Sequence, residues 1–410
     1  MLATFRPCFT APTFEVFTAL VAGLVAQPVS RTVCGMLTGA GLARVWHHCR
    51  AHRFFSAARW CPQRVGLVLA ELIVTCLLAP GASITVAVDD TLFGRRGKKV
   101  HAAGWFHDGS AAGQTKLGYG NNWVVVAIIV TLPFVSRPVA LPVLAALAVK
   151  GGSSKPDLAR DLIDLIAERF ADRDIHIVAD AAYGCRAFIG LGDGMTMTTR
   201  VKANAVFSQL APPRTGKRGR PRLKGDRIGT PADIAGSATW RTVRVSRYGT
   251  TSTVQITEQV CLWYGTWRTD TVQVILVRET GKKAVPAKGY GIALVTTDLE
   301  ATAEEIIARR GTDRSIRTSL SQHPDHLVRA ARPQPHRHSP ASRLGTLVQA
   351  QNRTLHLGHA RQAPTPDHRR PISTHLTPTS HNPRNPGSPA SLGSSRRMKC
   401  KSRGLRPRRV

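Results

Sequence analysis

Two runs of five residues, rich in β-branched apolar side chains, each end at an aspartate. They limit the possible folds more than any other feature of the chain. The first is Ile84–Val88, before Asp89, and the second is Ile175–Ala179, before Asp180. Runs of this kind are typical of strands that are buried on both faces of a sheet. The sequence therefore predicts an α/β fold in which two strands each end in a carboxylate.

The pattern around these runs changes several times along the chain, and it predicts five regions. Apolar residues at helical spacing precede the first run, short strands and an amphipathic helix at Lys155–Phe170 surround the two runs, and three alternating strands lie between Trp240 and Arg278. A last strand at Ile292–Thr297 leads to a helix that starts at Ala301. The predicted regions are a helical N-terminal region (1–80), a first part of a mixed-sheet core flanked by helices (81–200), a β-rich insertion with a basic loop (201–288), a second part of the core (289–309) and a basic tail (310–410).

Positive charge is concentrated at the end of the chain. Of the net charge of +32, +14 arises before residue 306 and +18 after it. The last aromatic residue is Tyr290, and 12 of the 26 prolines follow residue 305. A segment of this composition buries too little apolar surface to offset its conformational entropy, so we expect a disordered tail. The charge indicates a polyanionic partner, most simply nucleic acid. Translation of GC-rich DNA in a wrong frame would give the same tail composition.

Two short segments carry candidate contacts to DNA. Lys217-Arg218-Gly219-Arg220-Pro221-Arg222 resembles an AT-hook, whose arginines enter a narrow A·T minor groove. A solvated basic linker has the same composition. The helical N-terminal region is compatible with a helix-turn-helix that docks on DNA, and equally with a small helical bundle.

Other classes of site and location are disfavoured. The eight cysteines show no CxxC pair, which indicates reduced thiols in the cytoplasm. His47 and His48 beside Cys49 suggest a metal, but without a second ligand pair they are interpreted as surface residues of a basic helix. Apolar stretches are interrupted by Pro133 and Pro142 before they could span a bilayer, so no membrane association is expected.

Five short motifs identify a resemblance to a known family. They are Val88-Asp89-Asp90-Thr91-Leu92-Phe93 with Arg96-Gly97-Lys98-Lys99-Val100, His107-Asp108-Gly109-Ser110, Tyr119-Gly120-Asn121-Asn122-Trp123, Val178-Ala179-Asp180-Ala181-Ala182-Tyr183 and Leu294-Val295-Thr296-Thr297-Asp298. In order and spacing they resemble the DDE-superfamily endonuclease domain of bacterial insertion-sequence transposases, over roughly residues 1 to 310.

The resemblance implies an RNase H-like core, split by an insertion between its second and third acidic residues. By position, Asp89 resembles the first acid and Asp180 the second, and both would be catalytic residues and metal ligands. Asp90 competes with Asp89 for the first position, although strand alternation would point it to the opposite face. The implied cofactor is Mg²⁺, or Mn²⁺, in a two-metal site.

The third acid of the family has no counterpart here. After Ile306-Ile307-Ala308-Arg309, Arg317 stands where the family has its glutamate, and Glu305 is the last glutamate in the chain. Glu304 or Glu305 could substitute only from more than ten residues upstream. The simplest hypothesis is a frameshift near residue 310, which would make the chain pseudogene-like.

The resemblance thus predicts a DNA transposase that cleaves and transfers strands at insertion-sequence ends and is impaired by the lost acid. Its partners would be terminal-repeat and target DNA and a second copy of itself, in a nucleoid-associated cytoplasmic location. The alternative is a non-catalytic DNA-binding remnant. An RNA-binding protein is less favoured, because its basic segments would need exposed aromatic residues and the tail has none.

Overall fold

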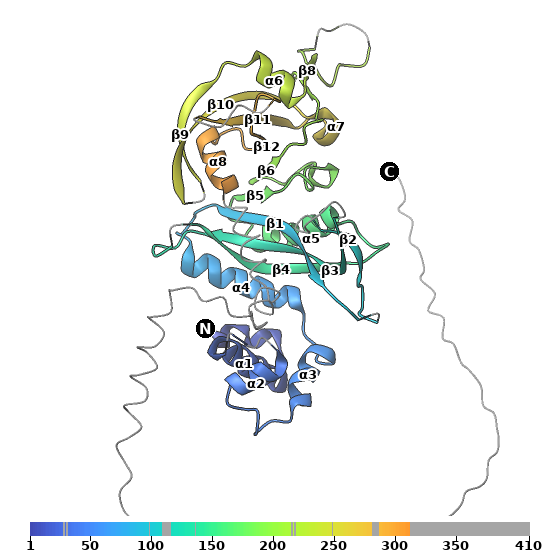
Figure 1. The fold of residues 1–410 in the computed structure, drawn as a ribbon, viewed down its shortest axis with the longest axis vertical. Coiled ribbons are helices and arrows are strands. Elements are labelled where there is room, and N and C mark those ends of the chain that lie inside the picture. Colours follow the sequence, from blue (N-terminus) through green and yellow to red (C-terminus); the bar gives the residue numbers. More distant parts are fainter. Residues whose placement is uncertain are drawn as a thin grey trace, which may run out of the picture. The chain divides into compact units, whose positions relative to one another are not determined.

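The computed structural model describes residues 1–311, apart from 28, 30, 31, 98, 109–115, 136, 215, 217, 218, 248 and 281–286. The chain divides into two units, Met1–Pro333 and Gln334–Val410, and every described residue belongs to the first. Figure 1 shows this unit as a helical region followed by a long mixed sheet with helices packed against it.

Within the described residues, one sheet of 12 strands runs through the α/β part of the molecule in the order β2-β3-β1-β5-β6-β12-β11-β10-β7-β8, with β4 on β3 and β9 on β10. Its core half consists of β1 (Ile84–Gly94), β2 (Gly104–His107), β3 (Leu117–Val130), β4 (Val139–Ala148), β5 (Ile175–Ala179) and β6 (Met195–Arg200). β1, β5 and β6 are parallel, whereas β3 is antiparallel to β1 and β4 is antiparallel to β3. The predicted RNase H-like mixed sheet is therefore confirmed.

Two helices cover one face of this core, α4 (Pro62–Leu77) and α5 (Lys155–Arg169). Helix α5 forms where the sequence predicts it, because the Ser154 side chain caps its first turn and its apolar residues recur at helical spacing. Leu162, Ile163 and Ile166 are buried against the sheet, and each contributes roughly 1.5–3 kcal/mol of hydrophobic stabilisation. The face that carries α4 and α5 is called the α5 face below.

Strands β1 and β3 are longer than the sequence predicts. β1 does not end at Asp89 but continues to Gly94, paired with β3 throughout. β3 begins at Leu117, before its apolar run, in a stretch that contains Gly118 and Gly120. Gly120 makes this possible, because a Cβ at that position would lie 2.1 Å from the carbonyl oxygen of Phe93. Only the parallel pairing of β1 with β5 stops next to Asp89, at the pair Val88 and Ala179.

The insertion extends the core sheet. It contains β7 (Phe207–Ser208), β8 (Arg227–Gly229), α6 (Pro231–Ser237), β9 (Arg241–Arg247), β10 (Thr250–Leu262), α7 (Tyr264–Trp267) and β11 (Thr271–Glu279). Strand β12 (Ile292–Thr296) then returns to the core and pairs with both β6 and β11. The sequence predicts β9, β10, β11 and β12 but misses β6, whose alternating Met and Thr residues give a weak apolar signal. β6 is the strand that joins the two halves of the sheet.

Helix α8 (Ala303–Gly311) follows β12 and begins with Glu304 and Glu305 in its first turn, as predicted. It packs beside β9, as Figure 1 shows, and Ile306 and Ile307 are buried in a small cluster with residues of β9, β10, β11 and β12. Except for Arg310 and Gly311, the predicted basic tail lies outside the described residues, and so does Arg317.

The N-terminal region is helical, as predicted. It contains the 3₁₀ helix η1 (Leu2–Cys8), α1 (Ala11–Ala26), α2 (Val33–Gly39), α3 (His48–Ser56) and α4. An aromatic cluster holds η1, α1 and α3 together, with the Phe9 and Phe17 rings stacked at a centroid separation of 4.6 Å. None of the helices in the described part of the chain is long and apolar enough to cross a membrane.

Candidate active site

Asp89 and Asp180 lie beside each other across two parallel strands. The register of β1 and β5 runs from Ile84 and Ile175 to Val88 and Ala179, so Asp89 and Asp180 occupy the next position on each chain. Neighbouring positions of parallel strands project to the same face, with backbones roughly 4.8 Å apart. Val88 and Ala179 both belong to the core under α5; Asp89, still within β1, alternates to the other face, whereas Asp180 lies one residue beyond the end of β5.

Asp89 is buried, with 6% of its surface exposed, and its Oδ1 accepts a hydrogen bond of 2.9 Å from the backbone N–H of Asp90. It shares its sheet face with a small apolar cluster that includes Ala87 and Val125. Asp180 is half-buried at the start of a turn, where its Oδ1 accepts a hydrogen bond of 2.7 Å from the backbone N–H of Ala182. Both carboxylates are therefore held in fixed positions by the backbone.

Asp90 belongs to a different cluster, on the α5 face. Its Oδ2 accepts hydrogen bonds from Lys155 Nζ at 2.8 Å and from Asn122 Nδ2 at 3.1 Å. Lys155 is the first residue of α5, where a cation opposes the helix dipole and gains from a carboxylate partner. The two consecutive aspartates thus serve opposite faces of the sheet, and Asp90 is engaged in an ion pair.

The sequence carries two local signals for this cluster. A lysine at the first position of a helix indicates a nearby anion, and an asparagine directly before the apolar run of β3 indicates a hydrogen-bond partner if the strand is buried. Neither signal identifies the partner, because Asn122 and Lys155 are 32 and 65 residues away from Asp90 in sequence.

Tyr183 lies close enough to all three aspartates for their charges to affect its pKa. Burial raises its pKa well above the usual range, and the negative charges of Asp90, Asp89 and Asp180 raise it further. Its hydroxyl therefore stays protonated, and the three aspartates gather negative potential at one end of the β1 and β5 pairing. Because Lys155 already neutralises Asp90, Asp89 and Asp180 are the two carboxylates whose charge favours a bound cation.

Residues of β6 and the insertion hold the chain around Asp180. Thr199 Oγ1 donates a hydrogen bond of 2.7 Å to the backbone carbonyl of Asp180. Trp267, fully buried in α7, donates from Nε1 to the carbonyl of Cys185 at 3.0 Å. Gly184 passes close to Trp263, where a Cβ would lie 3.1 Å from the indole ring. The β-rich insertion thus supports the loop that carries the second aspartate.

A cavity of about 450 Å³ opens beside this loop. Gly184, four residues after Asp180, forms part of its wall, together with Lys202, Lys224 and Tyr264. Lys224 Nζ lies 5.0 Å from the centre of the Tyr264 ring. Lysines beside an aromatic ring offer both charge for a phosphate and a face on which a base could stack.

The remaining candidate residues lie elsewhere. Lys217 and Arg218 of the AT-hook-like segment are outside the described residues, whereas Arg220 and Arg222 are exposed. Arg222 pairs with Asp226 at 2.9 Å, on the surface. The segment belongs to the loop between β7 and β8, away from the strands that carry Asp89 and Asp180.

Glu304 and Glu305 have structural partners. Glu304 accepts hydrogen bonds from Arg241 of β9, at 2.6 Å and 3.2 Å. Glu305 accepts one of 3.0 Å from the backbone N–H of Thr302, at the start of α8. These contacts direct both carboxylates to the insertion and to the helix N-terminus, so neither is a good substitute for the third acid.

Residues 4–261 match the model of the DDE superfamily endonuclease family. The matched segment is well over half of the chain and includes Asp89, Asp90 and Asp180. The chain belongs to the DDE superfamily endonuclease family. No curated protein matches it in a sequence search. In this endonuclease chain the family match ends within β10, before β11, β12 and α8.

Members of this family are nucleases that act on DNA and generally use divalent metal ions. The donors present here fit such an ion, because Asp89 in β1 and Asp180 directly after the neighbouring β5 offer hard carboxylate oxygens, as Mg²⁺ and Mn²⁺ prefer. The family match thus includes both aspartates, and the last turn of α8 carries Arg309 and Arg310 rather than a carboxylate.

Proposed function

We propose that this protein is a DNA transposase of the DDE type, with Asp89 and Asp180 as its remaining catalytic residues and metal ligands. The observation that carries the proposal is the position of the two aspartates, which occupy adjacent places next to the end of the β1 and β5 pairing. The substrate would be the terminal repeats of an insertion sequence, with two copies of the protein acting on paired ends.

In the proposed cleavage, water adds to a phosphorus at the element end and the bond from phosphorus to O3′ breaks. The products are a 5′-phosphate and a 3′-hydroxyl, and the proton lost by the water is balanced by the proton taken up by O3′. In strand transfer the 3′-hydroxyl replaces water as the nucleophile. Mg²⁺ or Mn²⁺ held by Asp89 and Asp180 would activate the nucleophile and stabilise the leaving oxyanion.

Loss of the third acid weakens this chemistry. With Asp89 and Asp180 as the two carboxylates proposed among the described residues, a second ion would be held less tightly, and Arg317 would bring a cation where the family has an anion. We therefore expect slow nicking and little strand transfer. A chain continued in an adjacent reading frame beyond residue 310 would recover activity if a frameshift caused the loss.

The test measures Mn²⁺ binding by titration calorimetry and nicking of a duplex that carries the repeats flanking the gene. Asp89→Asn and Asp180→Asn should each remove most Mn²⁺ binding and all nicking. Asp193→Asn, which changes an exposed aspartate on the loop before β6, is the matched control and should behave like the parent chain. Unchanged Mn²⁺ binding in Asp89→Asn would show the proposal to be wrong.

The alternative function is DNA binding without catalysis. It is favoured by the basic cavity beside Gly184 and by the overall charge of +32, neither of which needs a metal. A mobility shift with terminal-repeat DNA, combined with no nicking at any Mn²⁺ concentration, would select this alternative.

A further inference from the structure

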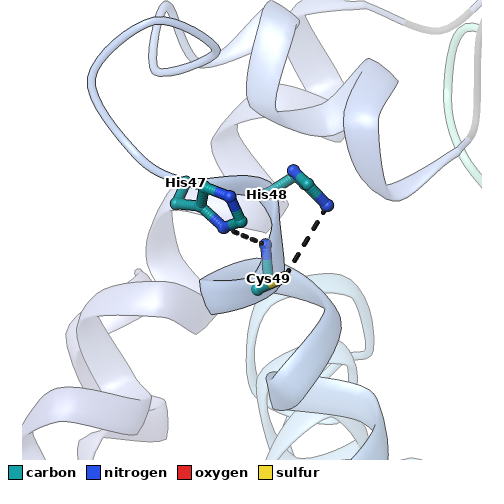
Figure 2. A group of neighbouring side chains, drawn as sticks. All are labelled: His47, His48 and Cys49. Carbon is teal, nitrogen blue, oxygen red and sulfur yellow. Dashed lines mark hydrogen bonds between the residues drawn. The ribbon is translucent and has the colours of Figure 1, made fainter. Parts of the chain in front are cut away.

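A second group of possible metal ligands lies in the N-terminal helical region, far along the chain from the aspartates. His47, His48 and Cys49, at the start of α3, each place one donor atom within 4.8 Å of the other two. The sequence alone favours surface residues of a basic helix for these three. The structure adds that their donor atoms converge, as Figure 2 shows.

The spacing within the cluster matches the size of a transition-metal site. His48 Nε2 and Cys49 Sγ are 3.7 Å apart. Zinc bonds to sulfur and nitrogen are about 2.3 and 2.0–2.1 Å long, so two such donors at a tetrahedral angle lie about 3.5 Å apart. Little movement of the two side chains would be needed to bind an ion between them.

His47 is the third donor, and its present contact is weak. Its Nδ1 accepts a hydrogen bond from the backbone N–H of Cys49 at 3.3 Å, near the upper limit for such a bond. The His47 and His48 rings lie with their centres 4.3 Å apart. A bound ion could therefore replace the long hydrogen bond at the start of α3 at small cost.

Further soft donors surround the cluster. The His52 ring meets the His48 ring edge-on, with centres 6.0 Å apart, and Cys34 Sγ of α2 lies 4.0 Å from His52 Nε2. All of these cysteines and histidines are exposed, so an ion can reach them without unfolding. Two helices thus contribute imidazole and thiol groups to one surface.

The donor chemistry selects the ion. Thiolate and imidazole ligands prefer Zn²⁺ and similar soft or borderline ions, whereas Mg²⁺ and Mn²⁺ prefer carboxylates. This site is therefore distinct in kind from the one at Asp89 and Asp180.

We propose that His47, His48 and Cys49 bind a zinc-class divalent ion, which fixes the start of α3. Three protein donors leave a fourth coordination position for water or for a donor from outside the cluster. Because binding replaces a weak cap of α3 with stronger bonds, the ion stabilises the helical region.

The test uses the full-length chain with Co²⁺ as a spectroscopic substitute for Zn²⁺. Asp89→Asn/Asp180→Asn serves as the background, so that ions held by the aspartates do not contribute. Co²⁺ should give a thiolate-to-metal charge-transfer band that excess Zn²⁺ removes. Zn²⁺ should also raise the midpoint of thermal unfolding.

Cys49→Ser and His48→Ala should lose the band and bind Zn²⁺ more than about tenfold more weakly. Cys76→Ser is the matched control, because Cys76 is an exposed cysteine on α4, and it should keep the band. Absence of the band in the background chain, or its persistence in Cys49→Ser, would overturn the proposal. Because the aspartates are already changed, neither result bears on the proposed transposase activity.

Discussion

Asp90 and Lys155 form an ion pair of 2.8 Å on the face of the sheet opposite to Asp89. The pair joins β1 to the first turn of α5, and Asn122 completes it with a hydrogen bond from β3. Of two consecutive aspartates, one is thus committed to the packing of a helix on the sheet. The other lies next to the end of the pairing between β1 and β5, where Asp180 follows β5.

Replacing Lys155 with methionine should therefore lower stability without affecting metal binding. The change leaves the partly buried Asp90 without its cation, at a cost of about 1.5–3 kcal/mol in the free energy of unfolding. Urea unfolding would measure the loss, and Mn²⁺ titration should give the parent affinity. Arg222→Met, which breaks the exposed pair with Asp226, is the control and should cost under about 1 kcal/mol. A large fall in Mn²⁺ affinity in Lys155→Met would instead implicate Asp90 in the metal site.

His176 gives the fold a specific acid sensitivity. Its pKa is lowered to about 4, mainly by burial and in part by the positive charge of Arg309, while the negative charge of Asp298 opposes the change. The unfolded chain takes up this proton near pH 6.5, whereas the folded chain resists it until about pH 4. Stability from this residue is therefore complete above pH 6.5 and falls with pH to about 4, by about 3 kcal/mol in all.

Urea unfolding at a series of pH values would measure this effect. His176→Asn, which keeps an acceptor for Thr196, should be less sensitive between pH 7 and pH 4 than the parent chain. His107→Asn alters an exposed histidine and should leave the pH dependence unchanged. Equal slopes for the parent and His176→Asn would contradict the assignment.

Gly23 should be intolerant of any side chain. A Cβ there would lie 1.7 Å from the carbonyl oxygen of Met36, because α1 and α2 touch at this point. We expect Gly23→Ala to lower the free energy of unfolding by about 1–3 kcal/mol or to separate the two helices. Gly236→Ala is the matched control, since a Cβ in α6 meets no atom within 4 Å, and it should be neutral or slightly stabilising. Thermal unfolding of both variants would decide, and equal midpoints would argue against the close packing of α1 on α2.

The AT-hook-like segment predicts that the affinity for DNA depends on the salt concentration. Alanine at Arg218, Arg220 and Arg222 should weaken binding to A·T-rich duplex DNA and reduce the slope of log affinity against log salt by roughly one to three. Fluorescence anisotropy at several salt concentrations would measure both. Arg137→Ala, at an exposed arginine between β3 and β4, should leave the slope unchanged. The same slope in the triple variant would assign the segment to a solvated linker.

The strands and helices with strong patterns were predictable from the sequence. The apolar runs at β1 and β5, the spacing in α5 and the acidic first turn of α8 are all local signals, and the structure has each element there. The family resemblance pairs Asp89 with Asp180, and this pairing stays a prediction. The contacts of Asp90, by contrast, depend on partners far away in sequence, which local patterns do not contain.

The predicted end of β1 was wrong for a related reason. A charged pair after an apolar run indicates a strand end, but β3 continues to pair with β1 beyond it, and the backbone hydrogen bonds there outweigh the weak local preference. β6 was missed because its polar threonines are satisfied by other residues of the sheet, as when Thr198 donates to Thr296. In both cases tertiary contacts, rather than the local sequence, determined where the strand forms.

The place of β12 between β6 and β11 has a consequence for the evolution of such chains. A segment that merely interrupts a domain can be lost by deletion without harm to its host, but here the interruption supplies the neighbour that β12 needs on one side. Removing residues 201–288 would strip β12 of that neighbour and expose an apolar strand to aggregation. Truncation within this segment should therefore prevent the endonuclease core from folding rather than merely shorten it.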